Sequence, residues 1–180
     1  MQTEPVSPFA RNAKRTGLGV ILVLIGAMWF YAFVFAPREA INRVNDREWA
    51  ARSEERCATV KRERFALQDL TEMNPEDRVA LRQKADIVER ATDALETLVN
   101  DIAADIPADA KGREIVPQWI DDYRKYLVDR RLFIERLRTQ DRRPDFNETE
   151  VGGVPVSERI NKFARENDMR SCQTPYDLSV

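Results

Sequence analysis

Apolar residues are distributed unevenly along the chain. The 22 residues from Thr16 to Pro37 carry no charge and are mostly apolar, whereas charged side chains recur throughout the rest of the sequence. A helix of about 20 residues spans the hydrocarbon core of a bilayer, where the backbone has to satisfy its own hydrogen bonds. The pattern predicts a transmembrane signal-anchor helix over residues 16–37. Trp29 and Tyr31 are the expected interface anchors near one end of it.

Two other interpretations of this segment are weaker. A buried core helix is rarely so long and so uninterrupted. A cleaved signal peptide usually has an apolar region of about 7–15 residues, and cleavage after Ala36 would leave Pro37 as a poor first residue.

The charges on the two sides of the apolar segment do not decide its orientation, because Lys and Arg are about equally frequent on both sides. Long domains translocate largely regardless of their charge. We therefore expect residues 1–15 to form a short cytoplasmic tail and residues 38–180 to form an extracytoplasmic domain.

The rest of the chain shows helical spacing of apolar residues. A thin apolar stripe predicts a first helix over residues 38–70, which continues the membrane helix or follows it as a stalk. A second helix is expected from Asn74, a good N-cap, and Pro75 to about residue 106. Inside it, five apolar residues alternate in spacings of three and four, typical of a coiled coil: Val88, Ala91, Leu95, Leu98 and Ile102.

Two further helices are expected after a loop over residues 107–114. The third begins near Val116, with Pro117 in its first turn, and ends by Pro144. The fourth is short and has Ser157 as its cap. No segment alternates between apolar and polar residues for long, so no substantial sheet is predicted.

The two cysteines, Cys57 and Cys172, favour a disulfide if the domain lies outside the cytoplasm. The alternative is two unrelated buried thiols in a cytoplasmic domain. The predicted fold is therefore all-α: one N-terminal transmembrane helix, then an extracytoplasmic bundle of three long helices and one short helix, closed by a disulfide.

Composition excludes several kinds of site. The chain has no histidine, so it holds no Ser-His-Asp triad and no histidine-ligated zinc. Two cysteines do not supply a four-thiolate metal site. With 29 basic and 31 acidic residues, the chain lacks the basic excess of a dedicated nucleic-acid-binding protein. We expect no metal, no cofactor and no nucleic-acid partner.

Arginines are dense near the end of the third predicted helix. Guanidinium groups match phosphate and carboxylate oxygens, so the cluster is a candidate site for an anion or an acidic partner. The alternative is a solvated face whose arginines pair with neighbouring carboxylates. The candidate residues are Arg130, Arg131, Arg136, Arg138, Arg142 and Arg143.

Carboxylates are abundant, but none is singled out as catalytic. Asp121 and Asp122 are adjacent and point to different faces of a helix. Glu135 and Glu158 are arbitrary choices for a general acid in an envelope-polymer hydrolase. We predict no catalytic residue and no enzyme activity.

The layout resembles small bitopic envelope proteins that scaffold larger membrane machines, such as accessory subunits of the division machinery. The resemblance concerns architecture only and rests on no motif. It favours a structural or accessory subunit that contacts the bilayer and a protein partner in the membrane or envelope. A homo-oligomer is compatible with the same layout. The alternative is an extracytoplasmic module that binds an anionic small molecule, lipid or envelope polymer through arginines and Trp119 or Tyr123.

Overall fold

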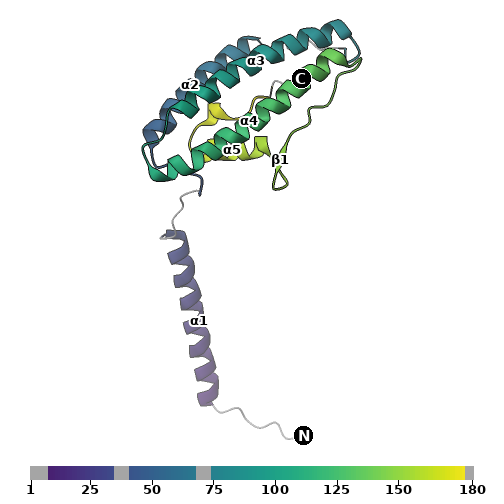
Figure 1. Ribbon diagram of the computed structural model, residues 1–180. Coiled ribbons are helices and arrows are strands. Elements are labelled where there is room, and N and C mark those ends of the chain that lie inside the picture. The colour runs from purple at the N-terminus through teal and green to yellow at the C-terminus, as the bar shows by residue number, and fades with distance from the viewer. Residues whose placement is uncertain (1–7, 35–40, 68–73, 177–180) are drawn as a thin grey trace, which may run out of the picture. The chain divides into compact units, whose positions relative to one another are not determined.

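The computed structural model describes residues 8–34, 41–67 and 74–176. The chain divides into two compact units, Met1–Glu39 and Ala40–Val180, and each is described by itself. In the first unit, the helix α1 covers Pro8–Val34 (Figure 1).

The helix α1 covers most of the predicted membrane segment, whose last three residues lie outside the described residues. The large apolar side chains that the structure describes in α1 are all exposed, from 45% at Ile25 to 71% at Val23. Over the described residues, no helix is both long enough and apolar enough to cross a membrane. The described residues of α1 therefore do not support the predicted transmembrane helix.

The second unit is a helical bundle. Three long helices are followed by a two-stranded hairpin, a short helix and one 3-10 turn. Their bounds are α2 Arg47–Leu67, α3 Arg78–Ala104, α4 Ala110–Thr139, β1 Glu150–Val151, β2 Val154–Pro155, α5 Val156–Glu166 and η1 Arg170–Cys172. The prediction of three long helices and one short helix is confirmed for the described residues.

The elements of the bundle pack in a closed circuit. The helix α3 packs between α2 and α4, α5 packs on the other side of α4, and η1 contacts both α5 and α2 (Figure 1). The short turn η1 therefore joins the last helix of the domain to its first. This arrangement brings residues near 57 and residues near 172 together.

The first helix of the bundle begins later than the sequence predicted. Residues 41–46 are not helical, and α2 begins at Arg47. The Asp46 carboxylate accepts hydrogen bonds from the backbone N–H groups of Trp49, at 2.9 Å, and Ala108, at 2.8 Å. Val44 is buried, and its N–H donates to Asn167 Oδ1 at 2.8 Å. Residues 41–46 are therefore not helical and are hydrogen-bonded to Ala108 and Asn167. The predicted helix over residues 38–70 is wrong for this part, and no continuous helix leads through it into α2.

The second helix also begins later than predicted. Asp77, and not Asn74, is its N-cap, because the Asp77 carboxylate accepts from the N–H groups of Val79 and Ala80. Asn74 instead accepts from the N–H of Glu76 in the preceding turn. The predicted seam residues are all buried, and they pack within the bundle: Val88, Ala91, Leu95, Leu98 and Ile102.

The starts of the last two helices differ from prediction as well. The helix α4 begins at Ala110, with Asp109 as its N-cap, so Pro117 lies inside it. Gly112 is required there, because an added Cβ would lie 2.6 Å from Asp109 Oδ2 and 2.7 Å from Pro107 Cβ. Ser157 lies inside α5, where its N–H and hydroxyl both donate to the Glu148 carboxylate at 2.8 Å. That carboxylate, from outside the helix, supplies the acceptor expected of a serine cap.

The core of the bundle has two buried clusters. The larger one lies among α2, α3, α4, α5 and η1. The smaller one lies between the N-terminal half of α3 and the C-terminal half of α4. Phe146 packs against both clusters and makes edge contacts with Tyr126 and Phe133. The loop after α4 therefore supplies apolar cover for both parts of the core.

The only sheet in the described part of the chain is the hairpin of β1 and β2. Val151 pairs with Val154 across a turn in which Gly152 and Gly153 have φ of 64° and 76°. Two consecutive positive φ values suit a tight two-residue hairpin, and glycine adopts them without strain. The expectation of no substantial sheet agrees with this short hairpin.

Asp105 ties the end of α3 to α2. Its carboxylate accepts from Arg52, at 3.2 Å to two nitrogens, and from Arg56 at 2.8 Å. The hydrogen bond from Arg52 is the main reason that the pKa of Asp105 lies below its ordinary value. The ionised form of the Asp105 carboxylate therefore stabilises the folded state more than the protonated form does.

We expect Asp105→Asn to destabilise the domain by about 1 kcal/mol near neutral pH, the range of such partly exposed ion pairs. Because the folded-state pKa is lowered, this contribution is complete above the unfolded pKa of about 3.9 and is lost as pH falls through the folded value. The difference between wild type and variant in urea unfolding should therefore stay constant from pH 7 to about pH 4 and then shrink as pH falls further through the folded pKa.

Asp121→Asn is the matched control, since Asp121 is exposed and pairs only with Lys125 on its own helix. A difference between wild type and Asp105→Asn that persisted unchanged below pH 3 would contradict the ionic origin of the effect.

Candidate functional site

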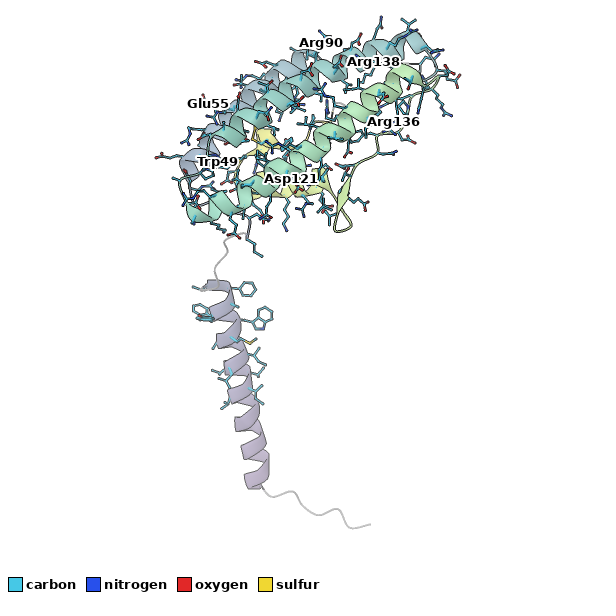
Figure 2. The ribbon with its side chains drawn as sticks, viewed as in Figure 1. Trp49, Glu55, Arg90, Asp121, Arg136 and Arg138 are labelled. Carbon is cyan, nitrogen blue, oxygen red and sulfur yellow. A yellow bond between two sulfur atoms is a disulfide. The ribbon has the colours of Figure 1, made fainter. Side chains whose placement is uncertain are left out.

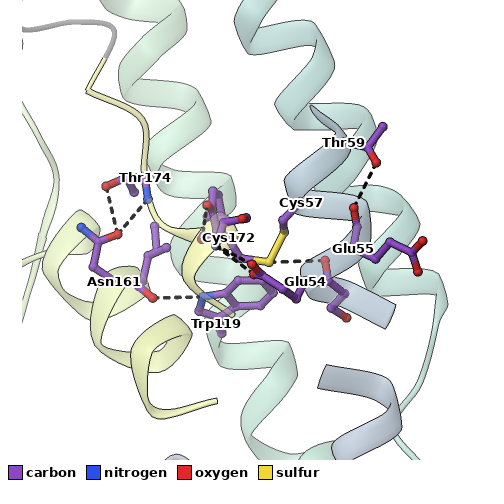
Figure 3. The surroundings of a disulfide bond; sticks show 12 residues. Glu54, Glu55, Cys57, Thr59, Trp119, Asn161, Cys172 and Thr174 are labelled. Atoms are coloured by element: carbon purple, nitrogen blue, oxygen red, sulfur yellow. Dashed lines mark hydrogen bonds between the residues drawn. A yellow bond between two sulfur atoms is a disulfide. The ribbon is translucent and has the colours of Figure 1, made fainter. Parts of the chain in front are cut away.

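The predicted disulfide between Cys57 and Cys172 is present. It joins α2 to η1 across 115 residues of sequence, and the two Cα atoms lie 5.1 Å apart (Figure 3). Both cysteines are buried. The disulfide closes the circuit of elements that builds the bundle.

Hydrogen bonds hold the chain on both sides of Cys172. The N–H of Ser171 donates to the Glu54 carboxylate at 2.8 Å, and the N–H of Thr174 donates to Asn161 Oδ1 at 2.7 Å (Figure 3). The Tyr123 hydroxyl donates to the Cys172 carbonyl at 2.6 Å. Burial raises the pKa of Tyr123, which keeps this donor protonated. The segment 170–176 is thus a fixed part of the fold.

A pocket lies next to the disulfide, and we call it the disulfide pocket. Its volume is about 130 Å³. Lys61, Arg64 and Phe65 of α2 form one wall, and six of the seven residues 170–176 form the other. Three of the lining side chains are cationic, and none of the described lining residues is acidic: the cations are Lys61, Arg64 and Arg170.

The sequence analysis missed this pocket, although the sequence carries a signal for it. Lys61 and Arg64 follow Cys57 by four and seven residues, which places all three on one face of a helix. Arg170 precedes Cys172 by two residues. Once the two cysteines are joined, these cations lie around the same pocket. The pattern is weak in the sequence, because the two halves of the pocket are far apart along the chain.

The predicted arginine cluster is divided among several structural roles. Arg131 donates to Asp93 at 2.6 Å and to Glu96 at 2.7 Å. Arg138, in the last turn of α4, donates to Asp86 at 2.9 Å and Glu89 at 2.6 Å (Figure 2). These ion pairs join α4 to α3, and each contributes little to stability because it is exposed.

Arg130 is fully buried. Its Nε donates to Thr92 Oγ1 at 2.8 Å, and its guanidinium lies 5.8 Å from the centre of the Tyr126 ring. Arg130 therefore lies on the buried face of α4. A fully enclosed guanidinium is not available to an outside ligand.

The other three arginines of the cluster lie apart from these. Arg136 donates to the Leu132 carbonyl of its own helix, and it is labelled near the end of α4 in Figure 2. Arg142 is exposed in the loop after α4. The backbone N–H of Arg143 donates to the Pro75 carbonyl at 2.8 Å. The structure therefore does not bring the six arginines together around one site.

Trp119, a candidate for the alternative ligand site, lines a hollow of about 380 Å³ between α4 and α5. Its ring stacks on Phe163, and its Nε1 donates to the Ile160 carbonyl at 3.4 Å (Figure 3). In the same hollow, Asp122 accepts from Arg159 at 2.8 Å. Positive and negative groups are mixed here, so this hollow does not select for an anion.

The carboxylates considered for catalysis are not brought together. Glu135 and Glu158 are both exposed, and they line different hollows. Asp129 is buried and accepts from the N–H and hydroxyl of Thr149. Among the described residues, no three potential metal-ligating side chains gather into a cluster.

The expected interface anchors lie on one end of α1. Trp29 is 54% exposed and Tyr31 is 66% exposed, and the Trp29 ring stacks on Phe33. Nothing in the described part of the chain buries either ring.

No protein-family model, no curated protein and no solved structure matches this chain.

Proposed function

We propose that this chain is a non-catalytic, single-pass membrane protein that acts as a structural or accessory subunit of a membrane or cell-envelope complex. In this proposal residues 1–15 lie in the cytoplasm, residues 16–37 cross the bilayer, and residues 38–180 form the domain outside. The observation that carries the proposal is the disulfide between Cys57 and Cys172. Such bonds persist in oxidising compartments and are rare in the cytosol.

The apolar surface of α1 supports the membrane assignment. A helix that is apolar on all sides is stable only when other apolar material covers it. The described side chains from Val20 to Val34 include twelve large apolar residues that are each at least 45% exposed. The sequence extends this stretch without charge, through Leu18 and Thr16 at one end and residues 35–37 at the other. A lipid bilayer is the cover that we propose, with Trp29 and Tyr31 at its interface.

The bonding of the buried carboxylates supports a non-catalytic role for the domain. Asp122 is engaged by Arg159, and Asp129 by Thr149. The sequence contains no histidine to serve as a general base. These features favour a domain that binds a partner through its surface over one that catalyses a reaction.

Topology is tested with single added cysteines in the otherwise oxidised full-length protein. Thr97→Cys places a thiol on an exposed turn of α3, and Gln2→Cys places one in the N-terminal tail. A membrane-impermeant maleimide should label Thr97→Cys in intact cells and Gln2→Cys only after lysis. The reverse pattern, or a domain released from membranes by carbonate washing, would contradict the proposal.

The accessory role is tested by isolating the tagged full-length protein in mild detergent and identifying co-purifying proteins by mass spectrometry. A stoichiometric partner is the expected result. A control with residues 16–37 scrambled at equal composition shows whether the span or the bundle makes the contact. A monomer or homodimer without a partner at several detergent strengths would argue against an accessory subunit. The second candidate function, an anion-binding module, is favoured by the cationic lining of the disulfide pocket.

A further inference from the structure

The disulfide pocket differs from the other hollows in its charge. Its lining contains three cations and no carboxylate, whereas the hollow beside Trp119 mixes Asp122 and Glu158 with its cations. The hollow lined by Asp129 and Glu135 and the hollow lined by Glu55 and Asp101 also contain carboxylates beside their arginines. Among these four hollows of the described chain, only the disulfide pocket has a lining with cations and no carboxylate.

Two of the three cations are available to a ligand. The Arg170 side chain is exposed and makes no ion pair or hydrogen bond in the described part of the chain. The Lys61 ammonium lies 5.9 Å from the centre of the Phe65 ring and has no carboxylate partner among the described residues. Arg64 lies deeper, with 7% of its surface exposed, and forms part of the α2 wall.

The disulfide is what places these groups on opposite walls. Lys61 lies one turn beyond Cys57 on α2, and Arg170 lies two residues before Cys172. The hydrogen bond from the N–H of Ser171 to Glu54 ties the same segment to α2, three residues before Cys57. A site held by a covalent bond and by backbone hydrogen bonds needs little reorganisation to bind.

We propose that the disulfide pocket binds a phosphate group, through Lys61 on one wall and Arg170 on the other. Two or more cations around a small cavity match a phosphate dianion better than a single carboxylate charge. At about 130 Å³, the pocket is smaller than the 300–1,000 Å³, roughly, of sites for drug-sized ligands, so it takes the charged group alone. The exposed rings of Phe65 and Tyr176 lie at the pocket and would contact whatever carries the phosphate. This proposal does not depend on the accessory role.

The test uses the full-length protein in micelles of a neutral detergent. Its unfolding temperature is followed as inorganic phosphate is added, with sodium chloride keeping the ionic strength constant. A ligand that binds only the folded state raises that temperature in a saturable way. In a second arm, phosphatidic acid replaces inorganic phosphate in the micelles, with phosphatidylcholine as the reference lipid. The two arms distinguish a soluble phosphate from a lipid headgroup.

The pocket variant is Lys61→Gln with Arg170→Gln, both on surface-accessible positions. The matched control is Arg82→Gln with Arg90→Gln, which also removes two charges. Those arginines are exposed on α3, and among the described residues each bonds only to a carbonyl of its own helix.

A saturable rise in wild type and control, with half-saturation shifted at least tenfold in the pocket variant, is the expected result in one arm or both. A response in the first arm identifies a soluble phosphate, and a response only in the second identifies a lipid phosphate. No saturable response in either arm, or the same response in the pocket variant and the control, would overturn the proposal. The second outcome would reflect the general stabilisation of folded proteins by phosphate salts.

Discussion

Replacing Cys57 and Cys172 together with alanine should lower the free energy of unfolding of the bundle by about 4–5 kcal/mol. The disulfide closes a loop of 115 residues. In the chain-entropy account, a loop of that length restricts the unfolded chain by about this amount, and small domains are stable by only about 5–15 kcal/mol. The tail that the disulfide holds has few large apolar residues of its own, so little else replaces the constraint.

The measurement is urea unfolding of the full-length protein, followed by tryptophan fluorescence, because Trp49 and Trp119 are both buried in the bundle. Reductant should shift the wild type toward the variant and should leave the variant unchanged. A loss below about 1 kcal/mol would mean that the Glu54, Tyr123 and Asn161 hydrogen bonds hold the segment 170–176 without the disulfide.

Trp49→Ala is expected to be the most damaging single substitution in the first helix of the bundle, with a loss of about 3–5 kcal/mol. Trp49 is fully buried in the larger core cluster, and its Nε1 donates to the Asp105 carbonyl at 2.6 Å. Alanine leaves a cavity and also removes that hydrogen bond. Trp49→Phe keeps most of the ring packing and should lose about 1 kcal/mol for the hydrogen bond, with a further loss for the smaller ring.

The chain provides its own control for this substitution. Trp29 lies on α1, where it is 54% exposed, and Trp29→Ala should leave the unfolding of the bundle unchanged. Trp119 fluorescence reports on unfolding in each of these variants. Equal losses from Trp49→Ala and Trp29→Ala would contradict the placement of Trp49 in the core.

The candidate site was only partly predictable. Its two cysteines were paired correctly, because two cysteines in a domain expected outside the cytoplasm have one intramolecular pairing. The cations of the disulfide pocket were not found, since Lys61 and Arg170 lie 109 positions apart by their numbers and meet only through the bond. The dense arginine run has a different role, because Arg131 and Arg138 form ion pairs with carboxylates of α3.

Some features of the helices depend on neighbouring residues and could be predicted, whereas others depend on residues far away in the sequence. The seam from Val88 to Ile102 was identified from spacing, since one turn of helix places such residues on one face. The start of α2 was misplaced because its N-cap, Asp46, is also held by the N–H of Ala108, sixty-two residues away. Ile106, four residues after Ile102, does not continue the seam and is 69% exposed, because α3 ends at Ala104.

The number and order of the bundle helices, the apolar character of residues 16–37 and the pairing of the cysteines could be predicted from the sequence. Periodicity and composition are local properties, and each can be counted along the chain. The enclosed arginine, the starts of the helices and the cations that line the pocket beside the disulfide became visible only in the folded structure. Those features depend on partners distant in sequence, and a charge becomes structural or available to a ligand only when its neighbours are in place.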